Sequence, residues 1–351
     1  MNIYLLIFII LAFFSFLSSK SKGARGLLLL TFFFLFFFAG LRGEGIGFDY
    51  DNYVDNIFKS DNLPFIEPGN MLLAGLLRPI GSVTLYFMTY AMVAVATKTL
   101  MIRRCSNYPI LSVLMYFSIY FLVQDMGQIR YGLAVGICTF ALISIANGDK
   151  KRFWVLVLLA SMFHFSALIV IPAYFIRKIQ FTPVVLYVLL IFGSAFVILD
   201  FSDIMYRILE LMPIEGISYR AAYYMVAEED NGAFGFNMSL LMRLCVLFVF
   251  YTYQKKHTSD KYFNTMFNFF LYGVISYCIL NFNQEFASRG SGYFKFLEVI
   301  LIPYVIYHIK RPQIRVVSIF FVIAYSFYSM AKIIYTPGTM GQYVPYKIVL
   351  F

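Results

Sequence analysis

The chain has 351 residues, of which 61% are hydrophobic and only 13% are charged, and its formal net charge is +10. Soluble domains carry about 25% charged residues, so this composition excludes a soluble enzyme, a secreted domain and a disordered chain, and it predicts an integral membrane protein. The basic residues stand in short clusters between apolar runs and form no basic face, which excludes nucleic-acid binding as the explanation of the charge.

Ten apolar runs predict an all-α polytopic membrane protein, because a helix needs about 20 apolar residues to cross the hydrocarbon layer. The runs lie near residues 3–19, 27–41, 83–101, 109–124, 130–147, 183–199, 238–254, 262–281, 291–308 and 315–334. A further stretch, 153–176, is interrupted at His164 and Pro172 and has basic residues at both ends. We expect a broken re-entrant hairpin with His164 near its tip, although two shortened spans would fit the same residues. The prediction is one transmembrane domain, 1–351, with about 10–12 transmembrane helices.

The charge pattern predicts the topology. Alternate loops carry lysine and arginine with few acids, and such loops stay in the cytoplasm. Both termini and two long segments, about 42–82 and 200–237, are therefore expected on the outer side, where nearly all the acidic residues fall. The first run has no basic n-region and no small-residue cleavage site, so we expect a span there and not a signal peptide. Long polar loops on a rigid scaffold commonly carry the chemistry, so the outer side is the expected site.

The first outer segment combines a flexible backbone with a carboxylate and aromatic rings. Arg42 is followed by alternate glycines at 43–47, and then by Asp49, Tyr50 and Tyr53. Alternate glycines permit positive φ angles and close approach of the backbone to a ligand. A carboxylate beside tyrosines suits a sugar, whose hydroxyl proton it can accept. The alternative is a turn within the aromatic belt at the membrane interface.

Three ionisable residues occupy unusual positions. Glu67 precedes a short apolar helix, where it is either a capping residue favoured by the helix dipole or a site carboxylate. Arg130 begins a span, where the same dipole repels a cation, so we expect a shared anion or a lipid headgroup beside it. His164 is either a satisfied core histidine or a functional group, and its place inside the membrane favours function.

Further cations and tyrosines lie in the C-terminal half. The second long segment contains Arg220 and Tyr223, and Arg243 follows one turn into the next span. Guanidinium groups match phosphate oxygens in a bidentate geometry, so these arginines are candidates for binding a phosphate.

Arg289 stands beside a Gly290-Ser291-Gly292 turn that is followed by Tyr293. If a helix begins at this turn, its free amides and Arg289 would form an anion cradle. Lys295 and Glu298 are spaced for an ion pair on that helix.

No motif indicates a cofactor. The sequence contains no Walker A motif, no Rossmann glycine pattern and no CxxC pair, so it predicts no nucleotide cofactor, no structural metal and no disulfide framework.

Taken in chain order, the motifs resemble the Wzy-type repeat-unit polymerases of O-antigen, capsule and exopolysaccharide synthesis, in their EpsG-like branch. The resemblance is carried by Gly47-Phe48-Asp49-Tyr50 with Tyr53, Glu67-Pro68-Gly69, Ile129-Arg130-Tyr131-Gly132-Leu133-Ala134, Phe163-His164-Phe165-Ser166-Ala167-Leu168-Ile169, Ser288-Arg289 with Tyr293-Phe294, and Pro345-Tyr346-Lys347. These motifs extend from about residue 40 to the C-terminus, and the second long segment matches least.

This resemblance implies a membrane glycosyltransferase of the bacterial plasma membrane. Such proteins use undecaprenyl-pyrophosphate-linked oligosaccharides on the outer side of the inner membrane. They transfer the growing glycan to an acceptor hydroxyl of a new lipid-linked unit. The resemblance also implies a Wzx-type flippase that supplies the units and a Wzz-type co-polymerase that sets chain length.

The residue set predicts a mechanism. Asp49 first, and Glu67 second, would orient or deprotonate the acceptor hydroxyl, and His164 would act as proton donor or base. Arginines would bind the lipid pyrophosphate, with Arg289 stabilising the charge on the leaving group. The expected pyrophosphate ligands are Arg42, Arg130, Arg220, Arg243 and Arg289, and the expected glycan ligands are Tyr50, Tyr53, Tyr223 and Tyr293.

Two other functions fit the same residues. The sequence contains one DxD spacing, Asp49-Tyr50-Asp51, but arginines could replace the divalent metal that many glycosyltransferases use, so the expected transfer is metal-independent. An O-antigen ligase would use the same donor with a different acceptor. A flippase or transporter of lipid-linked oligosaccharide is expected to show internal repeats, and none is visible.

Overall fold

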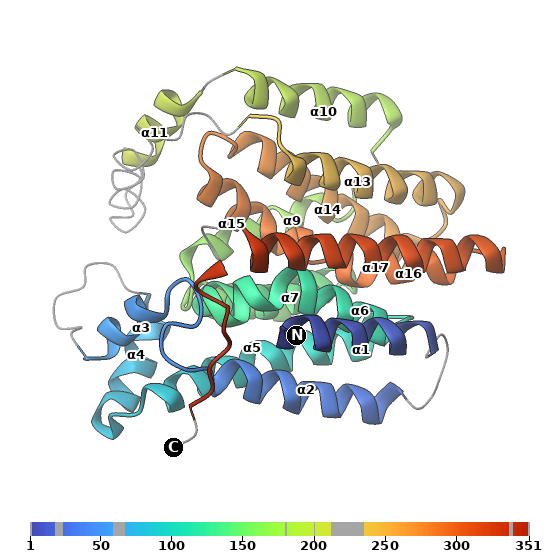
Figure 1. The fold of residues 1–351 in the computed structure, drawn as a ribbon. Helices are drawn as coiled ribbons and strands as arrows, with labels where there is room; N and C mark the ends of the chain where they lie inside the picture. The colour runs from blue at the N-terminus through green and yellow to red at the C-terminus, as the bar shows by residue number, and fades with distance from the viewer. Residues whose placement is uncertain are drawn as a thin grey trace.

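The computed structural model describes residues 2–17, 24–58, 67–179, 181–199, 201–211, 235–336 and 340–349, and this part of the chain is a bundle of helices (Figure 1). The α-helices are α1 (Ile3–Leu17), α2 (Ala24–Gly40), α3 (Tyr50–Phe58), α4 (Pro68–Leu77), α5 (Val83–Cys105), α6 (Pro109–Met115), α7 (Ile129–Ala146), α8 (Lys150–Ser161), α9 (Ala173–Ile176), α10 (Pro183–Ile198), α11 (Ser202–Glu210), α13 (Met238–Lys256), α14 (Lys261–Ile279), α15 (Gln284–Lys295), α16 (Glu298–Tyr307) and α17 (Pro312–Tyr335). The 3₁₀ helices η2 (Arg78–Ile80) and η4 (Phe165–Val170) and the π-helix η3 (Tyr116–Gly127) complete the described helical segments.

Within the described residues, four segments are long and apolar enough to cross a membrane alone: α5, the continuous stretch Pro109–Gly127, α7 and α17. Helix α10 qualifies only together with Ser202–Ile208, to which it is bent by 100°. Shorter apolar helices, among them α1 and α16, lie in the same bundle. The predicted all-α polytopic membrane protein is confirmed. The number of spans, expected from the apolar runs to be about 10–12, stays a prediction.

The centre of the bundle is formed by Pro109–Gly127 and α7. Within the spanning windows, 89% of the Pro109–Gly127 residues and 78% of the α7 residues are buried, against 28% for α17 at the periphery. Helix α5 packs against both α2 and α7, and α8 packs against α7. The peripheral helices point large apolar side chains outward, such as Ile191 and Phe321. A hydrocarbon environment solvates such side chains without cost, so these faces are suited to lipid.

Helices α3, α4 and α11 and both chain termini lie at one end of the bundle, which we call the loop end (Figure 1). The Tyr4 hydroxyl donates to the Tyr343 carbonyl oxygen at 2.9 Å, and Arg42 pairs with Ile348 in an isolated antiparallel bridge, so the C-terminal tail is tied to α1 and to the residues after α2. Both termini therefore share one end of the bundle, as predicted. Their placement on the outer side of the membrane stays a prediction.

The interrupted stretch 153–176 is a hairpin. Helix α8 ends at Ser161, and after a turn at 162–164 the chain returns through η4 and α9. The rings of Trp154 and Tyr174 lie 5.4 Å apart, so the two ends of the stretch meet again at the side from which it started. The tip contacts the start of α4, where the Gly69 amide donates to the Met162 carbonyl oxygen at 2.8 Å. The broken hairpin with His164 at its tip is confirmed.

The expected span 291–308 is wrong. Asn283 caps a helix eight residues earlier, because its side chain accepts hydrogen bonds from the amides of Glu285 and Phe286. The resulting helix α15 ends at Lys295, and a separate helix, α16, begins at Glu298. The apolar run therefore divides between two helices.

Gly47 fixes the turn between α2 and α3. Its φ angle is +103°, and a Cβ added there would lie 2.0 Å from the Met126 carbonyl oxygen. Gly45 also has a positive φ angle, so the expected conformation is confirmed for two of the three alternate glycines. The close approach is to the backbone at the end of η3.

We expect Gly47→Ala to destabilise the protein by about 1–3 kcal/mol, because alanine strains the positive φ angle and meets backbone that has little room to move. Thermal unfolding of the purified protein in detergent measures the change. Gly75→Ala is the matched control, because Gly75 lies within α4 and an added Cβ there meets nothing within 4 Å. Equal melting temperatures for the two variants would contradict the prediction.

Candidate functional site

Most of the predicted site residues gather at the loop end, although they come from five separate elements. We call the following residues the central cluster: Tyr53 of α3, Glu67 before α4, Arg130 and Tyr131 at the start of α7, His164 and Ser166 at the hairpin tip, and Arg289 and Tyr293 of α15. The contacts described below connect them into one group.

Glu67 and Arg130 form an ion pair. The Arg130 Nη1 lies 2.5 Å from the Glu67 Oε2, and the Glu67 side chain is completely buried while 20% of the Arg130 side chain is exposed. Glu67 occupies the N-cap position of α4, yet its side chain makes no capping hydrogen bond. The expected position at the start of the helix is therefore confirmed without a side-chain capping bond, and Glu67 is the anion beside Arg130.

Tyr53 also lies beside Arg130. The Arg130 guanidinium carbon is 5.6 Å from the centroid of the Tyr53 ring, and the Tyr53 side chain is buried. Burial raises the pKa of Tyr53, and the positive charges of Arg130 and Arg289 oppose that rise. Arg289 is therefore within electrostatic reach of Tyr53, which joins α15 to the Glu67–Arg130 pair.

His164 belongs to a chain of polar groups that leads to α15. Its Nδ1 lies 2.6 Å from the Ser166 Oγ, and that oxygen lies 2.8 Å from the Tyr293 hydroxyl. The Tyr131 ring stands edge-on to both His164 and Tyr293, at centroid distances of 5.4 and 5.2 Å. His164 is only 6% exposed. A buried histidine in this chain can pass or hold a proton through Ser166, as general acid–base catalysis requires.

Arg289 lies on α15 and contacts this group through its backbone. Its Nε lies 2.6 Å from the Glu285 Oε2, one helical turn earlier, and 23% of its side chain is exposed. Its backbone carbonyl oxygen accepts a hydrogen bond from the Tyr131 hydroxyl at 3.0 Å. Arg289 thus combines a fixed backbone with a guanidinium that solvent can reach.

The anion cradle of free amides that we expected at Gly290-Ser291-Gly292 is wrong. These residues lie inside α15, where the amides take part in helical hydrogen bonds. The glycines serve close packing instead, since a Cβ on Gly292 would lie 2.0 Å from the Tyr131 hydroxyl. The small residues therefore let α15 approach Tyr131.

A second group of charges adjoins the cluster. The Lys295 Nζ lies 3.3 Å from the Glu298 Oε1, which confirms the expected pair, and Glu298 also accepts a hydrogen bond from the Tyr120 hydroxyl at 2.7 Å. Arg243 and Lys332 lie within electrostatic reach of Lys295. Cations therefore outnumber the acid in this group.

Arg243 is buried in α13, and its guanidinium carbon lies 4.2 Å from the centroid of the Tyr277 ring. Among the described residues its Nε has no hydrogen-bond partner. A buried guanidinium with an unused donor has capacity to bind an anion.

Asp49 lies just before α3 and is half-buried. Within the described ranges its carboxylate has no hydrogen-bond or ion-pair partner. Its negative charge interacts electrostatically with Tyr53 and Tyr343. Of the expected carboxylates, Asp49 is thus the one that is accessible, while Glu67 is paired and buried.

Arg42 and Tyr50 face a different neighbour, Phe87. The Arg42 guanidinium carbon lies 4.0 Å from the Phe87 ring centroid, and the Tyr50 ring stacks on the same side chain at 4.9 Å. Arg42 donates to the carbonyl oxygens of Ala39 and Ile46, and burial lowers its pKa to about 10, which leaves it protonated at neutral pH. These contacts give Arg42 a packing role, and its expected contact with pyrophosphate stays a prediction.

Two expected ligands, Arg220 and Tyr223, lie outside the described residues, and their roles stay predictions.

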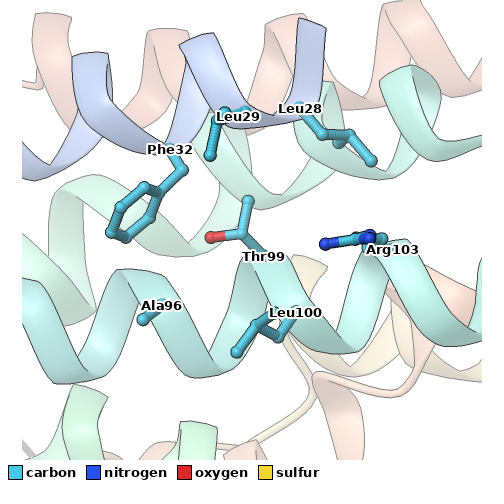
Figure 2. Close-up of a pocket in the computed structure, with 7 residues that line it drawn as sticks. All are labelled: Leu28, Leu29, Phe32, Ala96, Thr99, Leu100 and Arg103. Carbon is cyan, nitrogen blue, oxygen red and sulfur yellow. The ribbon is translucent and has the colours of Figure 1, made fainter. Parts of the chain in front are cut away.

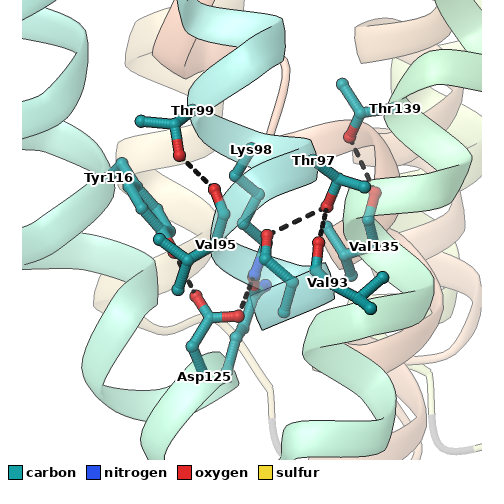
Figure 3. A network of polar contacts seen from close by, with 11 residues as sticks. Val93, Val95, Thr97, Lys98, Thr99, Tyr116, Asp125, Val135 and Thr139 are labelled. Carbon is teal, nitrogen blue, oxygen red and sulfur yellow. Dashed lines mark hydrogen bonds and ion pairs between the residues drawn. The ribbon is translucent and has the colours of Figure 1, made fainter. Parts of the chain in front are cut away.

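A buried ion pair that the sequence did not predict joins α5 to the end of η3 (Figure 3). The Lys98 Nζ lies 2.7 Å from the Asp125 Oδ1 and 3.0 Å from the Gln124 Oε1, and the Tyr116 hydroxyl donates to the Asp125 Oδ2 at 2.7 Å. The side chains of Lys98 and Asp125 are both completely buried. The available signal was a lone lysine inside an apolar run, which demands a partner in a membrane.

In the described ranges, no three or more histidine, cysteine, aspartate or glutamate side chains are grouped so that they could hold a metal ion. A cavity of about 190 Å³ between α2 and α5 is mostly apolar, with Thr99 and Arg103 among its lining residues (Figure 2). It includes none of the cluster residues.

Comparisons with known proteins give one family and one relative. The EpsG family matches residues 25–348 of the chain. The amylovoran biosynthesis protein AmsC of Erwinia amylovora is 22% identical over 317 residues, which cover 82% of this chain and 80% of that protein. No solved structure matches the chain.

Proposed function

The chain belongs to the EpsG family, and from this membership and the central cluster we propose that it is a polysaccharide polymerase of the bacterial plasma membrane. It transfers a growing glycan from undecaprenyl pyrophosphate to an acceptor hydroxyl of a new lipid-linked unit, on the outer side of the membrane. The similarity to a protein named for amylovoran biosynthesis supports a biosynthetic role. The single observation that carries the proposal is the convergence of Arg130, His164 and Arg289 at one end of an apolar helix bundle.

The proposed transfer is a direct displacement. The acceptor oxygen forms a bond to the anomeric carbon, the bond from that carbon to the pyrophosphate oxygen breaks, and the anomeric configuration is inverted. The acceptor proton passes to Asp49, whose carboxylate is accessible and has no described partner. The electron pair of the broken bond leaves on the lipid pyrophosphate.

Cations stabilise the departing pyrophosphate in this proposal. Arg289 is the first of them, because its guanidinium is partly exposed and lies near Tyr53 and Tyr131. Arg243 offers a second buried guanidinium, and Lys295 an ammonium group. His164 supplies or accepts a proton through Ser166 and Tyr293. Tyrosines around this position would contact the sugars through their rings and hydroxyls.

The proposal includes charge neutralisation without a divalent metal. We expect chelation with EDTA to leave polymer formation unchanged in isolated membranes that are supplied with lipid-linked units. The physical reason is that arginine and lysine can carry the stabilisation of the leaving group that a metal provides in other transferases. A loss of polymer that added Mg²⁺ or Mn²⁺ restores would contradict this part of the proposal.

The polymerase function is tested by deleting the gene in its host and separating the extracted surface glycan on a gel. We expect single repeat units on the outer surface in place of a ladder of long chains. Complete loss of outward-facing units would indicate a flippase. Unchanged polymer that is not attached to its acceptor would indicate a ligase.

The proposed partners follow from this reaction. A Wzx-type flippase would deliver the lipid-linked units to the outer side, and a Wzz-type co-polymerase would set the chain length. We expect both termini on the outer side, beside the cluster with which they share an end (Figure 1).

A further inference from the structure

At the end of the bundle opposite the central cluster, a hollow lies between α13, α16 and α17. Its volume is about 540 Å³. The charged and titratable residues that line it are Lys256, His257, His308, Lys310 and Arg311. They stand at the C-terminus of α13, the C-terminus of α16 and the N-terminus of α17. None of them takes part in the proposed glycan transfer.

The two histidines have the same hydrogen-bond arrangement. The Nδ1 of His257 lies 3.0 Å from the Tyr253 carbonyl oxygen, and the Nδ1 of His308 lies 2.9 Å from the Tyr304 carbonyl oxygen. Because a carbonyl oxygen only accepts, each Nδ1 carries the hydrogen. The Nε2 is then the ring nitrogen that can face a ligand, and on protonation it becomes a second donor.

The nearby acid does not neutralise the hollow. Asp260 lies beside it, where its carboxylate accepts hydrogen bonds from the Tyr304 hydroxyl at 2.7 Å and from the Phe263 amide at 3.0 Å. The second bond caps α14. One acid faces two lysines and one arginine, so the hollow keeps an excess of positive charge and suits an anion.

An apolar groove continues from the hollow along the bundle. The groove has a volume of about 340 Å³, and Ile302, Phe321 and Val322 are among its lining residues. Val249, Val305 and Ile309 line both the groove and the hollow, so the two are continuous. Phe321 is 69% exposed, which places an apolar surface where lipid surrounds the bundle.

We propose that the hollow and the groove together bind one phospholipid with an anionic headgroup. The phosphate lies among Lys256, Lys310 and Arg311, and one acyl chain lies along the groove. A free phosphate or another soluble anion would use the hollow and leave the groove unexplained. A zwitterionic lipid would use the groove but leave the excess positive charge unexplained. Basic pockets between membrane helices on the cytoplasmic side are suited to anionic headgroups, and the clusters of lysine and arginine predict that this end is cytoplasmic.

The experiment titrates the full-length protein in detergent with phosphatidylglycerol or phosphatidylcholine of the same acyl chains, and it counts bound lipid by native mass spectrometry. We expect phosphatidylglycerol to bind more tightly. The double variant Lys310→Gln with Arg311→Gln should weaken that binding about tenfold or more, since each lost charge removes attraction for the anionic headgroup. Lys150→Gln with Lys151→Gln is the matched control, because these exposed lysines belong to another cluster, at the start of α8. The control should bind phosphatidylglycerol as the unaltered protein does.

A second variant tests the groove. Val249→Trp places a large ring where the hollow and the groove meet, at a position that is 46% exposed and can accept it without unfolding. It should weaken phosphatidylglycerol binding and leave the binding of inorganic phosphate unchanged.

Three results would overturn the proposal: equal binding of the two lipids, equal effects of the Lys310–Arg311 variant and its control, or unchanged phosphatidylglycerol binding by the Val249→Trp variant. The readout is lipid binding, so it is independent of whether the chain polymerises glycan.

Discussion

Arg289→Ala is expected to lower the rate of glycan polymerisation by about 10²–10³-fold, while the amount and melting temperature of the protein stay close to those of the unaltered chain. One group that stabilises developing charge in a transition state typically contributes about 2.7–4 kcal/mol. Arg289 is the arginine of α15 that is both partly exposed and connected to the central cluster through Tyr131. Its ion pair with Glu285 is at the surface, with 40% of the Glu285 side chain exposed, so its loss should cost little stability.

The measurement is the length distribution of surface glycan in a deletion host that is complemented with each variant at equal protein level. Arg152→Ala is the matched control, because Arg152 is an exposed arginine at the start of α8, at the other end of the bundle. Glu285→Gln separates two roles of Arg289. If Arg289 only held Glu285 in place, Glu285→Gln would cause the same defect. If Arg289 binds pyrophosphate, Glu285→Gln should preserve or increase polymer, because the competing carboxylate is gone.

Arg289→Lys tests how much of the effect is charge. A lysine retains one positive charge but loses the bidentate geometry, so we expect partial recovery of polymer. Normal long-chain glycan in both Arg289→Ala and His164→Ala would contradict the site assignment.

The fold class followed from composition, because a chain with 61% hydrophobic and 13% charged residues has few solutions other than a membrane bundle. The hairpin at 153–176 was also predictable, since His164 and Pro172 interrupt an apolar run too short for two full spans. The position of α15 was not predictable from the sequence. The sequence places Asn283 and Gln284 before a Gly290-Ser291-Gly292 run that is typical of a turn, and only packing of the glycines against neighbours such as Tyr131 shows why a helix continues through it.

The types of residue in the site were predictable from the sequence, but the partners that they contact were not. The helix dipole argument predicted a shared anion or a lipid headgroup beside Arg130, and the structure supplies Glu67 from 63 positions earlier in the chain. Local patterns cannot identify such a partner, because the pairing depends on how α4, α7 and the hairpin tip pack. The same limitation explains Arg42, whose surroundings are set by Phe87 of α5 and by the C-terminal tail.

The buried Lys98–Asp125 pair links stability to function. Lys98 and Asp125 connect α5 with the end of η3, directly before the residues that lead to Arg130. In the same short stretch, the Met126 carbonyl oxygen is the backbone atom that Gly47 approaches. The pair therefore holds the turn that places Arg130 against Glu67, and a π-helix at this point is typical of a functional region.

Lys98→Met is accordingly expected to destabilise the protein by about 3–5 kcal/mol, because it leaves the buried Asp125 carboxylate without a counter-charge. The double variant Lys98→Met with Asp125→Asn removes both charges and should recover most of that loss. Melting temperatures in detergent measure the stability, and the glycan gel measures polymerisation. Lys295→Met is a useful comparison, because 14% of the Lys295 side chain is exposed and its pair with Glu298 has the longer distance of 3.3 Å. If the double variant is no more stable than Lys98→Met alone, the pair does not act as a unit. If it regains stability together with long-chain glycan, the two charges serve the site by holding the turn, and the chemistry belongs to the central cluster.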